Sequence, residues 1–269
     1  MPPYLGVDGC RGGWFGVQLS GAEAWEFAVM DRAERLAERF PEPALILIDT
    51  PIGLPHECGL KRTCDRLAAR LLRARRASFF PAPCRKLLGA ADYKTALALS
   101  RRLTGTGISK QTWNIGPKIL EVDRWLRANA AARERVREVH PEICFQALNG
   151  GRAMAESKRK PAGERQRLEL LTARYPAAPM LFDQALSAYP RRLLARDDIL
   201  DALANALSGW LSGGRLGGLP AEPEPDALGL PIQIGYPLLE GGPGIQPPEG
   251  CLSDLKTQSS TGIQPGPGS

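Results

Sequence analysis

Residues 4–14, with the sequence Tyr4-Leu5-Gly6-Val7-Asp8-Gly9-Cys10-Arg11-Gly12-Gly13-Trp14, decide the fold. The apolar run before Asp8 predicts a short strand, and the three glycines after it allow a tight reversal into a second strand at Trp14–Leu19. The unbroken apolar run Ala44–Ile48 predicts a buried parallel strand that also ends in an acid, Asp49. An acid at the tip of a buried strand is costly unless it is paired or coordinated, so both aspartates are candidate site residues.

Between these strands, Trp25–Met30 predicts a third strand. Asp31 and Glu34 have capping-box spacing and predict a helix that runs to about Phe40. Residues 56–135 predict a mostly helical insertion after the fourth strand. Its expected helices lie around Asp65–Arg76, Ala90–Leu103 and Pro117–Val136.

The second half of the chain predicts a fifth strand in two pieces, Val136–Val139 and Ile143–Phe145, broken at Pro141. A charged helical stretch follows at 156–175, and Asp198–Leu211 has the periodicity of a helix that is closed by two glycines. A last strand is expected at Pro231–Tyr236.

Composition indicates one folded domain over residues 1–240 and a disordered Gly/Pro-rich tail at 241–269. Apolar residues make up 43% of the 269 residues and charged residues 24%, as in ordinary globular proteins. No apolar run approaches the ~20 residues of a membrane helix. The N-terminus lacks the layout of a signal peptide. We therefore expect a cytoplasmic protein without a membrane partner, and its oligomeric state stays open.

The six cysteines are scattered and lack the spacing of a secreted disulfide framework. His56, Cys58, Cys64 and Cys84 fit no standard zinc pattern. The favoured interpretation is therefore a set of partly buried free thiols.

Positive charge is concentrated in one segment of this chain, whose formal net charge is +6. Between Lys61 and Lys86 there are nine Lys or Arg residues and one acid, Asp65. Such a patch suits a polyanionic substrate, although it is equally compatible with the solvated helix face of a basic protein. The arginines that we consider as substrate contacts are Arg11 in the glycine-rich turn and Arg66, Arg70 and Arg73 in the basic segment.

A three-stranded meander, a helix, a parallel strand tipped by an acid and a late helix carrying another acid outline a ribonuclease H-like domain. Right-handed crossover places the first and fourth strands side by side, so Asp8 and Asp49 should meet at the carboxyl ends of the strands. The expected fold class is therefore α/β, with a mixed five-stranded sheet and a helical insertion after the fourth strand.

The local motifs resemble those of domain-of-unknown-function family 429, whose members are predicted to be nucleases of ribonuclease H fold. The similarity covers about residues 4–237 and consists of several motifs in order. These are 8–14, 48–55, 64–66, 80–83, 109–115, 118–119 with 121–123, 140–142 and Asp198 with Asp201-Ala202.

The resemblance implies a carboxylate site for Mg²⁺ or Mn²⁺. Asp8 would be the ligand from the first strand, Asp49 the ligand from the fourth, and Asp201 or Asp198 the ligand from the last helix. Glu142 would be a further ligand or orient a water. Mg²⁺ binds through a few carboxylates and retains waters and substrate oxygens, which agrees with this set.

Each acid also has a structural interpretation. Asp8 could accept amide hydrogen bonds in its own turn, and Asp49 could cap a loop. Asp198 could be a helix N-cap, and carboxylates in a first helical turn favour the helix dipole in any case. His140, beside Glu142, could be a general base or a histidine packed against the sheet. Further along, polar donors suited to phosphate or base contacts open a helix at Lys110, Gln111, Asn114 and Lys118.

Three functions remain open on the sequence. The first is a metal-dependent nuclease that hydrolyses phosphodiesters in DNA or RNA through Asp8, Asp49, Glu142 and Asp201. The second is a catalytically inactive nucleic-acid-binding or scaffold protein of the same fold. The third is an actin-like phosphotransferase acting on a small substrate, which the glycine-rich turn after Asp8 would suit. Against it, the chain is short for two such domains, and no second phosphate loop with matching glycines is found.

Overall fold

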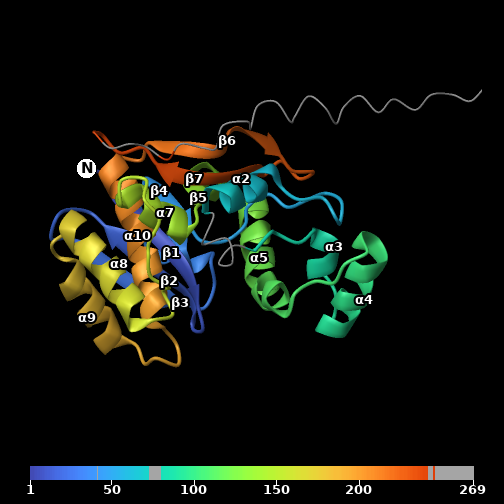
Figure 1. Ribbon diagram of the computed structural model, residues 1–269, viewed down its shortest axis with the longest axis horizontal. Coiled ribbons are helices and arrows are strands. Elements are labelled where there is room, and N and C mark those ends of the chain that lie inside the picture. Colours follow the sequence, from blue (N-terminus) through green and yellow to red (C-terminus); the bar gives the residue numbers. More distant parts are fainter. Residues whose placement is uncertain (41, 73–79, 242–244, 246–269) are drawn as a thin grey trace, which may run out of the picture.

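A mixed five-stranded sheet in the order β3-β2-β1-β4-β5 forms the centre of the computed structural model, which describes residues 1–40, 42–72, 80–241 and 245 (Figure 1). β1 pairs antiparallel with β2 and parallel with β4, and β4 pairs parallel with β5. This is the ribonuclease H-like arrangement expected from the sequence. The strands are β1 Tyr4–Cys10, β2 Gly13–Leu19, β3 Trp25–Met30, β4 Leu45–Ile48 and β5 Val136–Glu138.

Helices pack around the sheet, and five of those in the described residues lie between β4 and β5 as the expected insertion (Figure 1). No helix in the described part of the chain is long and apolar enough to cross a membrane. The helices are α1 Arg35–Arg39, α2 Thr63–Leu72, α3 Arg85–Leu88, α4 Tyr93–Thr104, α5 Lys110–Ala128, α6 Ala130–Arg135, α7 Pro141–Leu148, α8 Pro161–Arg174, α9 Ala178–Ala188 and α10 Arg196–Ser212.

Alternation along β1 divides the core into two layers. Leu5 and Val7 pack with residues of α1 and α5 on one face of the sheet. Gly6 and Asp8 point to the other face, where α10 lies directly on β1. A Cβ atom on Gly6 would lie 2.1 Å from the carbonyl oxygen of Ala202, so only glycine permits this close approach. The same contact brings the acids of α10 toward Asp8.

A second, two-stranded sheet is formed by β6 (Leu216–Pro225) and β7 (Pro231–Pro237). The sequence predicted only the second of these strands, because the glycines and prolines of β6 hide its period. The hairpin packs on α2 and α7 through a small apolar cluster that includes Leu67, Ile143 and Ile234. It also continues the main sheet locally, since Val139 and Gly235 form a parallel bridge.

The prediction of a strand at Ile143–Phe145 is wrong, because these residues lie in α7. His140 caps this helix: its Nδ1 accepts the amide hydrogen of Glu142 at 3.2 Å. Pro141 occupies the first turn, where its missing N–H is not needed. The proline therefore starts a helix and does not break a strand.

The expected capping box near residue 31 also differs. The helix begins at Arg35, and Asp31 forms an ion pair with Arg35 at 2.9 Å. The expected tail lies almost wholly outside the described residues.

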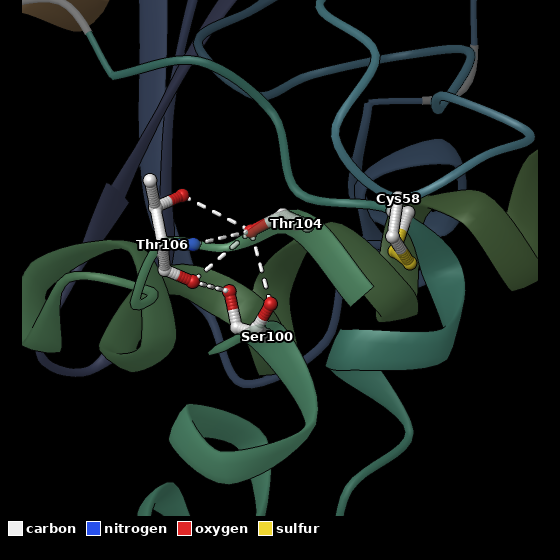
Figure 2. The surroundings of a disulfide bond; sticks show 5 residues. Cys58, Ser100, Thr104 and Thr106 are labelled. Atoms are coloured by element: carbon white, nitrogen blue, oxygen red, sulfur yellow. Dashed lines mark hydrogen bonds between the residues drawn. A yellow bond between two sulfur atoms is a disulfide. The ribbon is translucent and has the colours of Figure 1, made fainter. Parts of the chain in front are cut away.

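A disulfide joins Cys58 to Cys84, which corrects the expectation of free thiols there and removes both from any zinc set. Figure 2 shows the bond beside the end of α4, where Thr104 donates a hydrogen bond to the carbonyl oxygen of Ser100 at 2.9 Å. Among the described residues, three further cysteines are free and buried, namely Cys10, Cys64 and Cys144. The disulfide fixes the loop after β4 to the start of α3.

Candidate functional site

Asp8 and Asp49 meet at one edge of the sheet. Val7 lies beside Ile48 in the parallel β1–β4 pair, so Asp8, which is still within β1, and Asp49, which directly follows β4, lie at the same level. The amide of Asp49 donates to the carbonyl oxygen of Val7 at 3.1 Å, and the two carboxyl groups are close enough to interact electrostatically.

The last helix brings two more acids to the same edge. Asn205 ties α10 to β1, because its side-chain amide donates to the carbonyl oxygen of Val7 at 3.2 Å. One turn earlier, Asp201 is 1% exposed and interacts electrostatically with Asp8 and Asp49. Asp198 caps its own helix by accepting the amide hydrogen of Ala195 at 2.9 Å.

The electrostatics of this aspartate cluster, defined as Asp8, Asp49, Asp198 and Asp201, show an excess of negative charge. Burial, followed by repulsion from the other three acids, raises the pKa of Asp8 well above its usual value. Burial raises the pKa of Asp49 to about 7, although Lys158 opposes the shift. The pKa of Asp198 rises to about 6, again mainly through burial. In the absence of a further cation, the site therefore retains protons near neutral pH.

Lys158 is the cation beside this cluster, and no feature of the sequence singled it out. Its ammonium lies 2.5 Å from Oδ2 of Asp201 in an ion pair. Attraction to Asp201, stronger than the opposing effect of burial, raises the pKa of the lysine. Lys158 belongs to the turn before α8 and reaches the cluster only through tertiary folding.

A cavity of about 510 Å³ opens over the cluster. Asp8, Asp49 and Asp198 line it, whereas Asp201 lies beneath its wall. One face of α5 contributes three of the sequence-predicted donors to its lining, Gln111, Asn114 and Lys118. These residues recur at three- and four-residue spacing, so they share a side of the helix.

Lys118 is held against the start of β2, next to the turn that joins β1 to β2. Its ammonium donates to the carbonyl oxygen of Gly13 and lies 4.5 Å from the ring centroid of Trp14. Burial lowers its pKa. The predicted contact Lys110 is exposed and does not line this cavity.

Glu142 and His140 also line the cavity, from the start of α7. Glu142 is not a free carboxylate: Oε1 accepts a hydrogen bond of 2.6 Å from the buried guanidinium of Arg167. Arg167 comes from α8 and, like Lys158, was not singled out from the sequence. The charge of Glu142 nevertheless contributes to the raised pKa of Asp49.

The loop after β4 is anchored from two sides. The buried Arg62 pairs with Glu138 of β5 at 2.7 Å and with Asp65 of α2 at 2.5 Å. Glu138 also accepts the amide hydrogen of Ile52 at 2.6 Å, and burial raises its pKa to about 7. From the other side, the amide of Leu54 donates to Asp226 at 2.9 Å. These contacts fix the path of the chain just after Asp49.

The basic segment Lys61–Lys86 is not a uniformly solvated charged surface, because some of its arginines form ion pairs within the fold. Arg62 is buried in these ion pairs, and Arg85 pairs with Asp123 and Asp226. The predicted contacts Arg66 and Arg70 are exposed residues of α2 that do not line the cavity, and Arg73 lies outside the described residues. Arg11 lines a neighbouring cavity instead.

The spacing of possible metal ligands distinguishes two groups. Among the described residues, the one trio of acidic or thiol ligands with atoms within 4.8 Å of one another is Cys64, Asp65 and Glu138. The guanidinium of Arg62 already bridges its two carboxylates. The aspartates over β1 and β4 are more widely spaced, and their charge exceeds what Lys158 neutralises. Mg²⁺ often uses one or two carboxylates and retains several waters, so this oxygen-rich cluster fits it better.

Comparison with known proteins identifies the family to which the chain belongs. The family described as "Protein of unknown function (DUF429)" matches residues 6–225. No curated protein and no solved structure gave a match. Because the family match spans most of the sequence, including β1, β4 and α10, the chain belongs to this family.

Proposed function

We propose that the protein is a divalent-metal-dependent phosphodiesterase that hydrolyses nucleic acid. The observation that carries the proposal is the convergence of Asp8, Asp49, Asp198 and Asp201, from three separate elements, at one edge of the sheet. Open α/β sheets favour active sites at the carboxyl ends of their strands. The cavity above adds hydrogen-bond donors from α5, as a phosphate-bearing substrate requires.

The aspartates are the residues that would hold the ion. Asp8, Asp49 and Asp198 line the cavity, and Asp201 supports them from beneath. Burial, together with repulsion between the acids, raises the pKa values of Asp8, Asp49 and Asp198, which supports an added cation at this site. Mg²⁺ or Mn²⁺ in such a site supplies an activated water and stabilises the leaving oxygen of a phosphodiester.

The other side chains of the cavity have roles that follow from their contacts. Lys118, fixed against Gly13 and Trp14, can donate to a phosphate oxygen without first losing much side-chain freedom. Gln111 and Asn114 offer amide donors and acceptors on the same helix face. Lys158 forms an ion pair with the buried Asp201.

The experiment compares Mn²⁺ binding, measured by calorimetry, in the wild type and in Asp8→Asn. Asp183→Asn, which changes an exposed aspartate of α9, is the matched control. We expect Asp8→Asn to lose Mn²⁺ binding and the control to retain it. Because burial already disfavours the charged form of Asp8, the metal-free variant should be at least as thermostable as the wild type.

Cleavage of labelled DNA and RNA by the same three proteins completes the test. We expect Mn²⁺-dependent products with the wild type and the control but not with Asp8→Asn. Equal cleavage by Asp8→Asn would refute the proposed site. Salt-sensitive binding without cleavage or metal dependence would instead support the scaffold interpretation.

A further inference from the structure

A second cavity, of about 290 Å³, lies beside the aspartate cluster and is lined mainly by cations. It is bounded by the β1–β2 turn, the turn before α8, α8 itself and the first turn of α10. The helices α8 and α10 lie close together (Figure 1). We call it the arginine pocket. Its basic lining residues are Arg11, Lys158, Arg159, Arg167, Arg191 and Arg196.

Three of these cations are already neutralised. Lys158 pairs with Asp201, Arg167 with Glu142, and Arg196 with Glu164. The remaining three are exposed and make no hydrogen bond or ion pair with the described residues, namely Arg11, Arg159 and Arg191. Against them the pocket offers one further acid, Asp197. Glu164, which is paired with Arg196, also interacts electrostatically with Arg191. The basic residues of the lining still outnumber its acids, so the arginine pocket has a net positive charge.

Arg167 provides an independent indication of a missing acceptor. Its side chain is fully buried, and its two terminal nitrogens donate to Glu142, to the carbonyl oxygen of Glu156 and to that of Gly163. Its Nε is buried without a partner. Buried donors almost always have an acceptor, so this nitrogen is an exception in the described structure, and it belongs to a residue that lines the arginine pocket.

The chemistry of the lining selects a phosphate group as the ligand. Guanidinium groups match phosphate oxygens with paired donors and stay charged at all relevant pH values. The pocket also borders the start of the 17-residue helix α10, whose unpaired amides favour an anion. Its volume suits a small group and is below that of most drug-sized ligand sites.

Two residues connect the pocket to the proposed active site. Lys158 and Arg159 line both cavities, so a chain that passes from one to the other stays in contact with the same turn. We propose that the arginine pocket binds a phosphate of the nucleic-acid strand that enters the aspartate cavity. The assignment of that strand rests on the proposed function, whereas phosphate binding itself requires no catalysis. The phosphate belongs either to a strand end or to the internal backbone, and the experiment separates the two.

The test uses the full chain in chelator, so that no cleavage occurs. Binding of a labelled single strand is measured for the wild type and for the double variant Arg159→Gln/Arg191→Gln. The control is Arg101→Gln/Arg102→Gln, which removes the same charge from exposed positions of α4. All four side chains are exposed, so melting curves should match the wild type. Two strands of one sequence are compared, with and without a 5′-phosphate, and inorganic phosphate is the competitor.

We expect the pocket variant to bind at least about tenfold more weakly than the wild type, and the control no more than about twofold, because two charge-assisted contacts are lost only in the former. A preference of the wild type for the 5′-phosphorylated strand, lost in the pocket variant, assigns a strand end. Equal binding of both strands assigns the internal backbone. Equal weakening in both variants, or no binding by the wild type, would overturn the inference. Neither result affects the Mn²⁺ test, so the two proposals can fail separately.

Discussion

Replacing Gly6 by alanine should separate β1 from α10 and disturb the site from a distance. A Cβ atom at this position would lie 2.1 Å from both the carbonyl oxygen of Ala202 and the amide nitrogen of Ala206. Ordinary contact begins at 3.4 Å, so the strand and the helix must move apart by about 1.3 Å. The clashing atoms belong to the backbone of a helix, which cannot rotate away as a side chain can.

The expected loss of stability follows from this displacement. Overpacking a core by one methyl group costs about 1–3 kcal/mol, and more where the neighbours are rigid. We expect Gly6→Ala to lose at least about 3 kcal/mol of unfolding free energy. Because α10 carries Asp198 and Asp201, Mn²⁺ affinity should fall roughly 10–100-fold, as it does when the support of a metal ligand is removed.

Urea unfolding and Mn²⁺ calorimetry measure both effects. The control is Gly21→Ala, whose new Cβ atom would meet its nearest neighbour at an ordinary 3.5 Å. This change should leave stability unchanged or raise it by about 0.4–1 kcal/mol, since it restricts the unfolded chain. If Gly6→Ala is as stable as the control, the close packing of α10 on β1 does not determine the position of the site.

Three further predictions concern other parts of the fold. The folded protein holds protons that the unfolded chain releases, because the pKa of Asp49 rises from 3.8 to about 7. The metal-free protein should therefore lose stability as pH rises from about 4 to 7, and urea unfolding should show a smaller loss in Asp49→Asn; equal pH profiles would contradict the shift. Arg62→Met leaves two buried carboxylates unpaired and should cost about 3–5 kcal/mol, against about 0.5 kcal/mol for the exposed Arg66→Met. Reducing the Cys58–Cys84 disulfide, which closes a separation of 26 residues, should cost about 3–4 kcal/mol in thermal or urea unfolding. An unchanged midpoint after complete thiol labelling would show that the bond does not constrain the unfolded chain.

The sequence predicted the parts of the fold that depend on local pattern. Apolar runs located the strands that end at Asp8 and Asp49, and chain-crossover rules placed these two residues side by side. The strand expected at Ile143–Phe145 failed because a histidine cap and a first-turn proline resemble a broken strand when only short-range hydrophobicity is considered.

The cations of the site could not be predicted in the same way. Lys158 lies in an irregular turn and meets Asp201, 43 residues away in sequence, only in the folded state. Arg167 looks like one more charged residue of a polar helix, although it is fully buried. A local sequence pattern carries no information on which charge faces inward when the partner comes from another element.

The packing of α10 on β1 also has a consequence during protein synthesis. Asn205 contacts Val7 across 198 residues in sequence. The central strand β1 therefore cannot be covered by α10 until most of the chain has been translated. At about 5–20 residues per second, that delay is roughly 10–40 s. Throughout this interval the face of the nascent sheet that α10 later covers lacks its covering helix. We expect a chaperone or the ribosome surface to bind this apolar face until α10 is synthesised.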